Sequence, residues 1–277
     1  MNSKTIGVIS VKGGVGKTSA VSALGASLAN QFNKKVLVVD GNFSSPTLGF
    51  HIGLYNPEIT LHHVLDGKAN IKDAIHQTDY GFDILPGALV YDKAAKINPF
   101  KLAEKMRDLK KRYDVILIDS SPNLDDEILA TMIASDELLI VTTPDHVTLA
   151  STLRAIKSAK EKRVPILGMI LNKVHDKNFE LTLEEIENMS GAQILAVIPH
   201  ELGVLESLSV STPSTMRNKD SESTIEYRKL AGALVGEEYT ARRNFGGWLR
   251  YFMKAVPKQE VNRVILKDNR INNPFYK

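Results

Sequence analysis

The stretch VKGGVGKTS, residues 11–19, constrains the fold of this chain more than any other part of the sequence. Its three glycines can turn backbone N–H groups toward an anion, and such a loop requires a strand before it and a helix after it. Residues 5–11 are apolar and rich in β-branched side chains, and residues 18–31 carry apolar side chains at helical spacing. The sequence therefore predicts a strand, a phosphate-binding loop (P-loop) and a helix in succession.

The side chains of the predicted P-loop have separate parts in phosphate binding. Lys17 is expected to reach the β- and γ-phosphates of a nucleotide, and the hydroxyl of Thr18 is expected to bind Mg²⁺. The standard P-loop pattern opens with glycine, whereas this chain has Val11 there. The residues predicted to contact the nucleotide through this loop are Gly13, Gly14, Val15, Gly16, Lys17, Thr18 and Ser19.

Beyond the loop, predicted strands alternate with predicted helices. Strands are expected at residues 35–40, 82–86, 115–119, 137–142, 166–172 and 193–199, and helices at residues 61–65, 71–75, 99–113, 148–163, 181–189 and 225–235. The alternation predicts an α/β fold with a doubly wound, mainly parallel sheet, which binds ligands at the carboxyl ends of its strands. We expect one P-loop domain over residues 1–239 and a basic amphipathic tail over residues 240–277.

The segment KGGVGKT, with its leading lysine, resembles the deviant Walker A motif of the MinD/ParA family of ATPases. The resemblance extends in motif order over residues 4–235. It implies a protein that binds ATP and Mg²⁺ and forms a homodimer around the nucleotides, in which Lys12 reaches the phosphates held by the partner subunit. Because a cation of one chain then meets a phosphate of the other, the γ-phosphate controls the stability of the dimer.

The segment VVDGNFSSPTLG, residues 38–49, resembles the first switch segment of the family. By this resemblance Asp40 helps to hold the Mg²⁺ shell, but Asn42 stands where family members commonly have a second Asp that orients the attacking water. An amide can hydrogen-bond a water but cannot accept its proton, so we expect slow ATP hydrolysis. The resemblance assigns catalysis to Lys12, Lys17, Asp40 and Asn42, while the alternative is that Asn42 serves only the turn.

The segment VILIDSSPNLDDE, residues 115–127, resembles the Walker B strand and second switch segment. Its Asp119 is then a magnesium ligand through water, together with Thr18 and Asp40. The alternative for Asp119 is a cap on a following helix. The family commonly has glycine where this chain has Asn123, so the conformation of this segment stays open.

Two later segments resemble the parts of the family that recognise the base. ILNKV, residues 170–174, places Asn172 where its amide can both donate to and accept from adenine. VIPHE, residues 197–201, places Pro199 against the base, with His200 at a position where an acidic residue is common.

The tail, residues 240–277, differs in charge from the rest of the chain. It holds nine basic and two acidic residues, a net charge of +7, whereas the whole chain carries +3, so the body carries about −4. At helical spacing its basic residues lie opposite an apolar stripe, which is typical of a helix at a membrane surface. The stripe consists of Phe245, Trp248, Leu249, Phe252, Met253 and Val256.

MinD proteins carry a C-terminal membrane helix of this kind, whereas ParA proteins generally lack one. The tail therefore favours a MinD-like ATPase whose ATP dimer associates with an anionic membrane surface, positions division or other surface structures, and responds to an activating protein partner. With no signal-peptide pattern, no apolar run that spans a bilayer and no cysteine, we expect a cytoplasmic protein, peripheral at the inner face of the cell membrane.

Three alternatives stay open from the residues alone. The tail can dock on the body or on a partner protein. The chain can be a ParA-like ATPase that moves DNA cargo, with its basic tail on the DNA phosphates. It can also be a scaffold that retains ATP because Asn42 has removed turnover. The adjacent His62 and His63 are expected to be a surface pair rather than a metal site.

Overall fold

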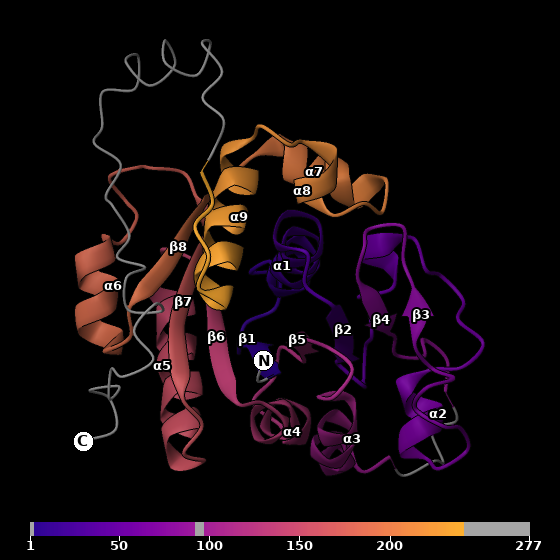
Figure 1. Cartoon of the computed structure of the whole chain (residues 1–277). Coiled ribbons are helices and arrows are strands. Elements are labelled where there is room, and N and C mark those ends of the chain that lie inside the picture. The colour runs from indigo at the N-terminus through magenta and orange to yellow at the C-terminus, as the bar shows by residue number, and fades with distance from the viewer. Residues whose placement is uncertain (1–2, 92–96, 241–277) are drawn as a thin grey trace.

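A computed structural model describes residues 3–91 and 97–240, and its eight strands form one sheet (Figure 1). The strand order is β3-β4-β2-β5-β1-β6-β7-β8, and the β3–β4 pair is antiparallel while the other pairs are parallel. The strands are β1 (Lys4–Ile9), β2 (Val36–Gly41), β3 (His76–Gln77), β4 (Asp83–Leu85), β5 (Val115–Ser120), β6 (Glu137–Thr142), β7 (Ile166–Val174) and β8 (Ile194–Pro199). The predicted α/β, mainly parallel architecture is confirmed.

Helices cover both faces of the sheet, as a parallel sheet requires. On one side lie α1 (Lys17–Phe32), α7 (Leu202–Ser209), α8 (Ser214–Arg217) and α9 (Glu222–Val235). On the other side lie α2 (Leu61–Leu65), α3 (Leu102–Leu109), α4 (Asp126–Ala134), α5 (His146–Glu161) and α6 (Leu183–Ser190). Two short 3₁₀ turns, η1 (Phe50–Ile52) and η2 (Pro99–Lys101), complete the described elements.

The central strands β2 and β5 are buried at every residue, which explains why their sequences are continuous apolar runs rather than alternating ones. Both runs end in an aspartate, Asp40 and Asp119, and the two residues face each other in the β2–β5 register. The sheet thus brings two acidic side chains together at its carboxyl edge. No helix within the described ranges has the length and apolar character needed to cross a bilayer.

Two of the expected helices differ from the structure. Residues 71–75 form turns that lead into β3, because the side chain of Asn70 accepts a hydrogen bond from the Lys72 N–H (3.0 Å) and so competes with helical bonding. Residues 99–113 begin as η2 and continue as α3, which ends at Leu109.

Three helices, α4, α7 and α8, were not predicted. For α4 the sequence carried a usable signal, since the side chain of Asp125 caps the N–H groups of Glu127 (3.0 Å) and Ile128 (3.3 Å).

Gly25 lets α1 lie close to the sheet. A Cβ atom at this position would lie 2.9 Å from Cγ2 of Val38 and 3.4 Å from Cδ1 of Phe82. We therefore expect Gly25→Ala to lower the free energy of unfolding by about 1–2 kcal/mol, since overpacking outweighs the better helix propensity of alanine. The measurement is urea denaturation of the full chain.

Gly203→Ala in α7 is the matched control, because the nearest atom to its new Cβ would be the terminal Nδ2 of Asn218 at 3.3 Å. We expect this variant to be neutral or more stable by up to about 1 kcal/mol. Equal effects of the two substitutions would contradict the packing explanation.

Candidate functional site

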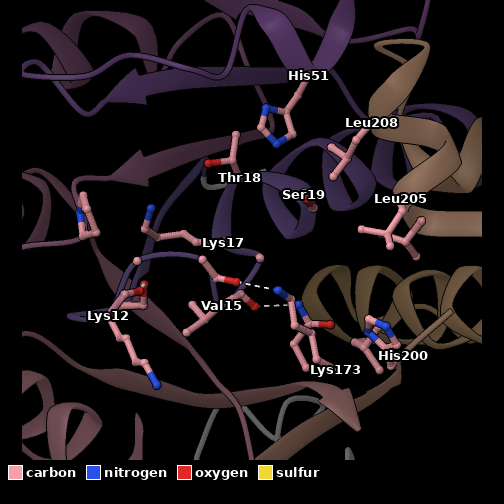
Figure 2. A pocket seen from close by; sticks show the side chains of 18 of the residues that line it. Lys12, Val15, Lys17, Thr18, Ser19, His51, Lys173, His200, Leu205 and Leu208 are labelled. Atoms are coloured by element: carbon pink, nitrogen blue, oxygen red, sulfur yellow. Dashed lines mark hydrogen bonds between the residues drawn. The ribbon is translucent and has the colours of Figure 1, made fainter. Parts of the chain in front are cut away.

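A cavity of about 310 Å³ opens at the carboxyl edge of the sheet, beside the first turn of α1 (Figure 2). It is lined by the predicted P-loop, by residues at or just after the carboxyl ends of β2, β5, β7 and β8, and by side chains of α7 and α9. The site residues predicted from the sequence that lie on its wall are Lys12, Gly13, Gly14, Val15, Gly16, Lys17, Thr18, Ser19, Asn42, Asn172 and Pro199. Asp40 and Asp119 are buried next to it.

The end of β7 holds the P-loop from outside. The Asn172 Nδ2 donates to the carbonyl of Val15 and the Lys173 Nζ donates to the carbonyl of Gly14, each at 2.7 Å (dashed lines in Figure 2). The C=O and N–H of one trans peptide point in opposite directions, so the N–H groups of Val15 and Gly16 are turned away from β7. This arrangement leaves them available for an anion at the start of α1.

Two glycines make this loop conformation possible. Gly14 and Gly16 have φ angles of +77° and +93°, a region that residues with a side chain rarely adopt. A Cβ at Gly16 would also lie 2.2 Å from the Nδ2 of Asn172. The loop therefore needs glycine at position 16 both for its backbone angles and for its contact with β7.

Lys17, Thr18 and Asp119 form a buried cluster at the base of the loop. The Nζ of Lys17 lies 3.3 Å from one carboxylate oxygen of Asp119, and the hydroxyl of Thr18 donates to the other at 2.7 Å. Lys17 is 8% and Asp119 1% exposed, so each charge is compensated by the other away from bulk water. The alternative role of Asp119 as a helix cap does not appear, since Asp125 caps α4.

The pKa of the neighbouring Asp40 is raised to about 8, by burial first and then by the negative charge of Asp119. The N–H groups of Asn42 (3.2 Å) and Leu48 (3.0 Å) donate to its carboxylate and oppose this rise. Additional positive charge in the site would favour the ionised form of this carboxyl group.

The oxygen atoms around Asp119 suit a hard cation such as Mg²⁺. The Thr18 hydroxyl touches the Asp119 carboxylate, and Asp40 is its opposite residue on the adjacent strand. Within residues 3–91 and 97–240, no group of three or more His, Cys, Asp and Glu side chains could hold a metal by itself. The site therefore fits a cation that brings phosphate and water ligands with it, as Mg²⁺ does with nucleotides.

Asn42 uses its side-chain amide within its own loop. Its Nδ2 donates to the carbonyl of Ser45 (2.6 Å), and the N–H of Ser45 donates to its Oδ1 (3.3 Å). These contacts belong to a turn, while the same residue also lines the cavity. Both interpretations of Asn42 stay predictions.

The loop that contains Asn42 is tied to α4 and α2 by contacts that sequence reasoning missed. Glu127 of α4 accepts from the Phe43 N–H (2.9 Å) and from the Ser44 hydroxyl. On the other side, the carbonyl of Phe43 lies 3.0 Å from the Nε2 of His62. No local pattern marks Glu127 as a partner of this loop, because the two segments are far apart in the chain.

His62 is not the surface residue expected from the sequence, since it is only 3% exposed. The Ala88 N–H donates to its Nδ1 (3.0 Å), so Nε2 carries the proton that is donated to the carbonyl of Phe43. Burial lowers the pKa of His62, which favours this neutral form. The apolar neighbours Leu61, Val64 and Leu65 were the available signal for a buried position.

Lys12 points away from Lys17 (Figure 2) and contacts the start of α5 in its own chain. Its Nζ donates to the hydroxyl of Thr148 (2.8 Å) and lies 3.7 Å from the carboxylate of Asp145. Burial by itself would raise the pKa of Asp145, but hydrogen bonds from Thr143 and Thr148 hold it down at about 2. Lys12 therefore faces a firmly ionised carboxylate.

The far end of the cavity is apolar. Leu205 and Leu208 of α7 lie across the loop from Lys12, together with His200 (Figure 2). Ile198 and Val204 also line the cavity. The predicted tail does not bear on this description, because residues 241–277 lie outside the described part of the chain.

Comparisons with known proteins agree with the geometry. The family model described as an AAA domain matches residues 3–169. An uncharacterized ATP-binding protein of Methanocaldococcus jannaschii is 30% identical over 86% of this chain and 89% of its own length. The septum site-determining protein MinD of Synechocystis is 26% identical over 85% of this chain and 90% of its own length.

A solved structure of MinD from Pyrococcus horikoshii, complexed with Mg-ADP, superposes with a TM-score of 0.79 at 32% identity and covers 83% of this chain and 95% of that one. The matched region contains the P-loop and both aspartates of the sheet edge. The chain belongs to the AAA domain family and, within it, to the MinD/ParA-like P-loop ATPases.

Proposed function

We propose that this chain is a MinD-like switch that binds Mg-ATP, dimerises around it, associates with a membrane and hydrolyses ATP slowly. The contact among Lys17, Thr18 and Asp119 carries the proposal. It places the Lys17 ammonium, which can bind phosphate, beside the Thr18 hydroxyl and the Asp119 carboxylate, which can serve as metal ligands, at the base of the P-loop. The Mg-ADP in the related MinD structure supports the same ligand for this site.

In this proposal the residues of the site have different roles in phosphate transfer. The loop N–H groups and Lys17 bind and orient the phosphates, and Thr18, Asp40 and Asp119 would hold Mg²⁺ directly or through water. When bound, the metal supplies positive charge that neutralises the β- and γ-phosphate oxygens. Asn42 would orient the attacking water without accepting its proton, so turnover is slow.

Lys12 is suited to report on a second subunit. Its contacts with Thr148 and Asp145 are half-exposed, and exposed ion pairs of this kind contribute less than about 1 kcal/mol. Lys12 can therefore exchange these contacts for the phosphates of a nucleotide held by the partner subunit. ATP then stabilises the dimer through charge-assisted hydrogen bonds that cross the interface.

The tail connects the dimer to the membrane in this proposal. One short amphipathic helix binds weakly, but two tails on one dimer raise the avidity without new contacts. ATP would thus move the protein from the cytoplasm to the inner face of the cell membrane, where it positions division or other surface machinery. An activating partner would release it by stimulating hydrolysis.

A second candidate is a scaffold that keeps its ATP. The observation that favours it is that both polar atoms of the Asn42 side-chain amide bond to the backbone of Ser45, so that this side chain serves the turn. Stoichiometric retained ATP with no phosphate release would select this function over the switch.

The first test concerns Lys12 and the dimer. Lys12→Ala should leave ADP affinity within about twofold, because the side chain does not face its own loop, yet should abolish the ATP-dependent dimer. Lys17→Ala should instead weaken both nucleotides by more than about tenfold. Calorimetry and light scattering with ATP and with ADP measure these effects, and an ATP dimer that survives in Lys12→Ala would contradict the assigned role.

The second test concerns the tail. Full-length protein should sediment with anionic vesicles in ATP but not in ADP, and Trp248→Glu should remove this by placing a charge in the apolar stripe. Gln259→Glu adds the same charge outside the stripe and should sediment as the wild type does. Equal sedimentation in ATP and in ADP would contradict the proposed membrane switch. Salt-sensitive DNA binding without vesicle binding would favour the ParA-like alternative.

The third test uses the pH dependence of stability. A carboxyl group whose pKa is raised from about 4 to about 8 on folding favours the folded state below pH 4, and this contribution is lost as pH rises toward 8. The nucleotide-free wild type should therefore lose stability between pH 5 and pH 8, by at most about 1.4 kcal/mol per pH unit.

Asp40→Asn should flatten this slope, whatever its effect on absolute stability, because the amide does not titrate in this range. Asp83→Asn is a suitable control, since Asp83 is also a strand aspartate but lies at the start of β4, away from the site. Parallel slopes for wild type and Asp40→Asn would show that Asp40 does not hold the extra proton.

A further inference from the structure

Tyr227 stands out among the side chains of the cavity. It comes from α9, is 2% exposed and belongs to the apolar core between α1, α9 and the sheet, yet it also lines the cavity. No pattern in the sequence marked it as a site residue. Its position places a phenol at the boundary between the core and the proposed nucleotide site.

No hydrogen bond of the Tyr227 hydroxyl is found within the described ranges, 3–91 and 97–240. The hydroxyl is also not among the fully enclosed polar atoms that lack a partner, so it keeps access to the cavity that Tyr227 lines. Buried polar groups are nearly always paired, so this one calls for a partner. Three other tyrosine hydroxyls, of which only that of Tyr113 belongs to a buried residue, do have partners. The hydroxyl of Tyr113 donates to Asp83 (2.7 Å), that of Tyr80 to the carbonyl of Ser211 (3.1 Å), and that of Tyr55 to the Ser211 hydroxyl (2.9 Å).

Protein atoms surround Tyr227 on the core side, so the cavity is the space from which a partner can come. Burial raises the pKa of Tyr227, which keeps the hydroxyl protonated and able to donate. The missing partner is thus a hydrogen-bond acceptor on a ligand.

The place of Tyr227 in the cavity indicates which part of the ligand it meets. The P-loop and Lys17 take the phosphates, whereas Tyr227 belongs to the same apolar cluster as Val15 and Ile198, which also line the cavity. An apolar slot with few polar groups suits an aromatic ring better than a ribose or a phosphate. Asn172 lines the same cavity with its Oδ1 free to accept, since its Nδ2 is bonded to Val15.

We propose that the Tyr227 hydroxyl donates a hydrogen bond to a ring nitrogen of the adenine base of bound ATP. With the Asn172 oxygen as acceptor for the exocyclic amino group, the site offers one donor and one acceptor to a base that presents the complementary pair. This inference rests on the proposed ATP binding and adds a base-recognition residue to it.

The test is Tyr227→Phe in the full chain, which removes only the hydroxyl. Calorimetric titration should show ATP bound about five- to tenfold more weakly, as expected for one lost hydrogen bond. 2′-Deoxy-ATP should lose affinity by the same factor, because the bond is to the base. Inorganic tripolyphosphate should bind wild type and variant equally, because it lacks the base.

A thermal melt without nucleotide separates this role from a structural one. Removing an unpaired buried hydroxyl should leave the melting temperature unchanged or raise it. Tyr113→Phe is the matched control. It removes a hydroxyl that is paired with Asp83 on the other side of the sheet, so it should lower the melting temperature and leave ATP affinity unchanged.

Three outcomes would overturn the inference. They are unchanged ATP affinity in Tyr227→Phe, a loss confined to ATP with 2′-deoxy-ATP unaffected, and an equal loss for tripolyphosphate. If the wild type binds no ATP at all, the proposed function fails as well. If the wild type binds ATP and Lys17→Ala does not, an unaffected Tyr227→Phe removes only the role of Tyr227.

Discussion

The hold of strand β7 on the backbone of the P-loop is the contact on which the rest of the site depends. Asn172 and Lys173 occupy the carbonyls of two successive loop residues, and this fixes the opposite direction of the N–H groups that receive a phosphate. The hold is close, because the Asn172 amide fills the space that a side chain at Gly16 would need. Gly16 is also the residue before α1, so the same contact sets where that helix begins and where Lys17 emerges. Phosphate binding is therefore organised by a strand that follows the loop by more than a hundred residues.

The charges at the carboxyl edge of the sheet follow from the position of Lys17 and from the strand register. A parallel register brings Asp40 and Asp119 face to face in the buried centre of the sheet, and Lys17 compensates only one of them by direct contact. The second carboxyl group is left with a raised pKa, so the site has a surplus of potential negative charge before any ligand arrives. Lys12, in contrast, is held at a half-exposed position by Asp145. The two lysines of the motif therefore differ in burial. Lys17 is paired in the core, whereas Lys12 is half-exposed and free to exchange its partner.

What the sequence alone could predict was local. The P-loop, the apolar strands and the aspartates at strand ends are short patterns whose physics lies within a few residues, and the structure has them where they were expected. The missed features join distant segments. Glu127 reaches Phe43 across 84 positions, and Tyr227 belongs to a helix whose apolar spacing shows that it is buried but not what lies beside it. Residues 71–75 show the same limit at short range, because one asparagine side chain outweighed helical spacing.

In the loop around Asn42, the backbone is held by other elements, whereas the Asn42 side chain bonds only within the loop. Its backbone is fixed by Glu127 on one side and His62 on the other, whereas the Asn42 amide is committed only to Ser45. To orient a water in the proposed ATPase, this amide would use its second N–H or lone pair, or exchange its contacts with Ser45. In the proposed function, slow turnover would have two physical causes, a side chain that cannot accept a proton and a turn that competes for the same amide. Glu127 lies at the start of the helix that follows Asp119, and its carboxylate accepts a hydrogen bond from the backbone of this loop, so the loop and α4 are joined by a charged contact. In the proposed function, an activating partner that shifts α4 would act on the Asn42 loop through Glu127 and the backbone of Phe43.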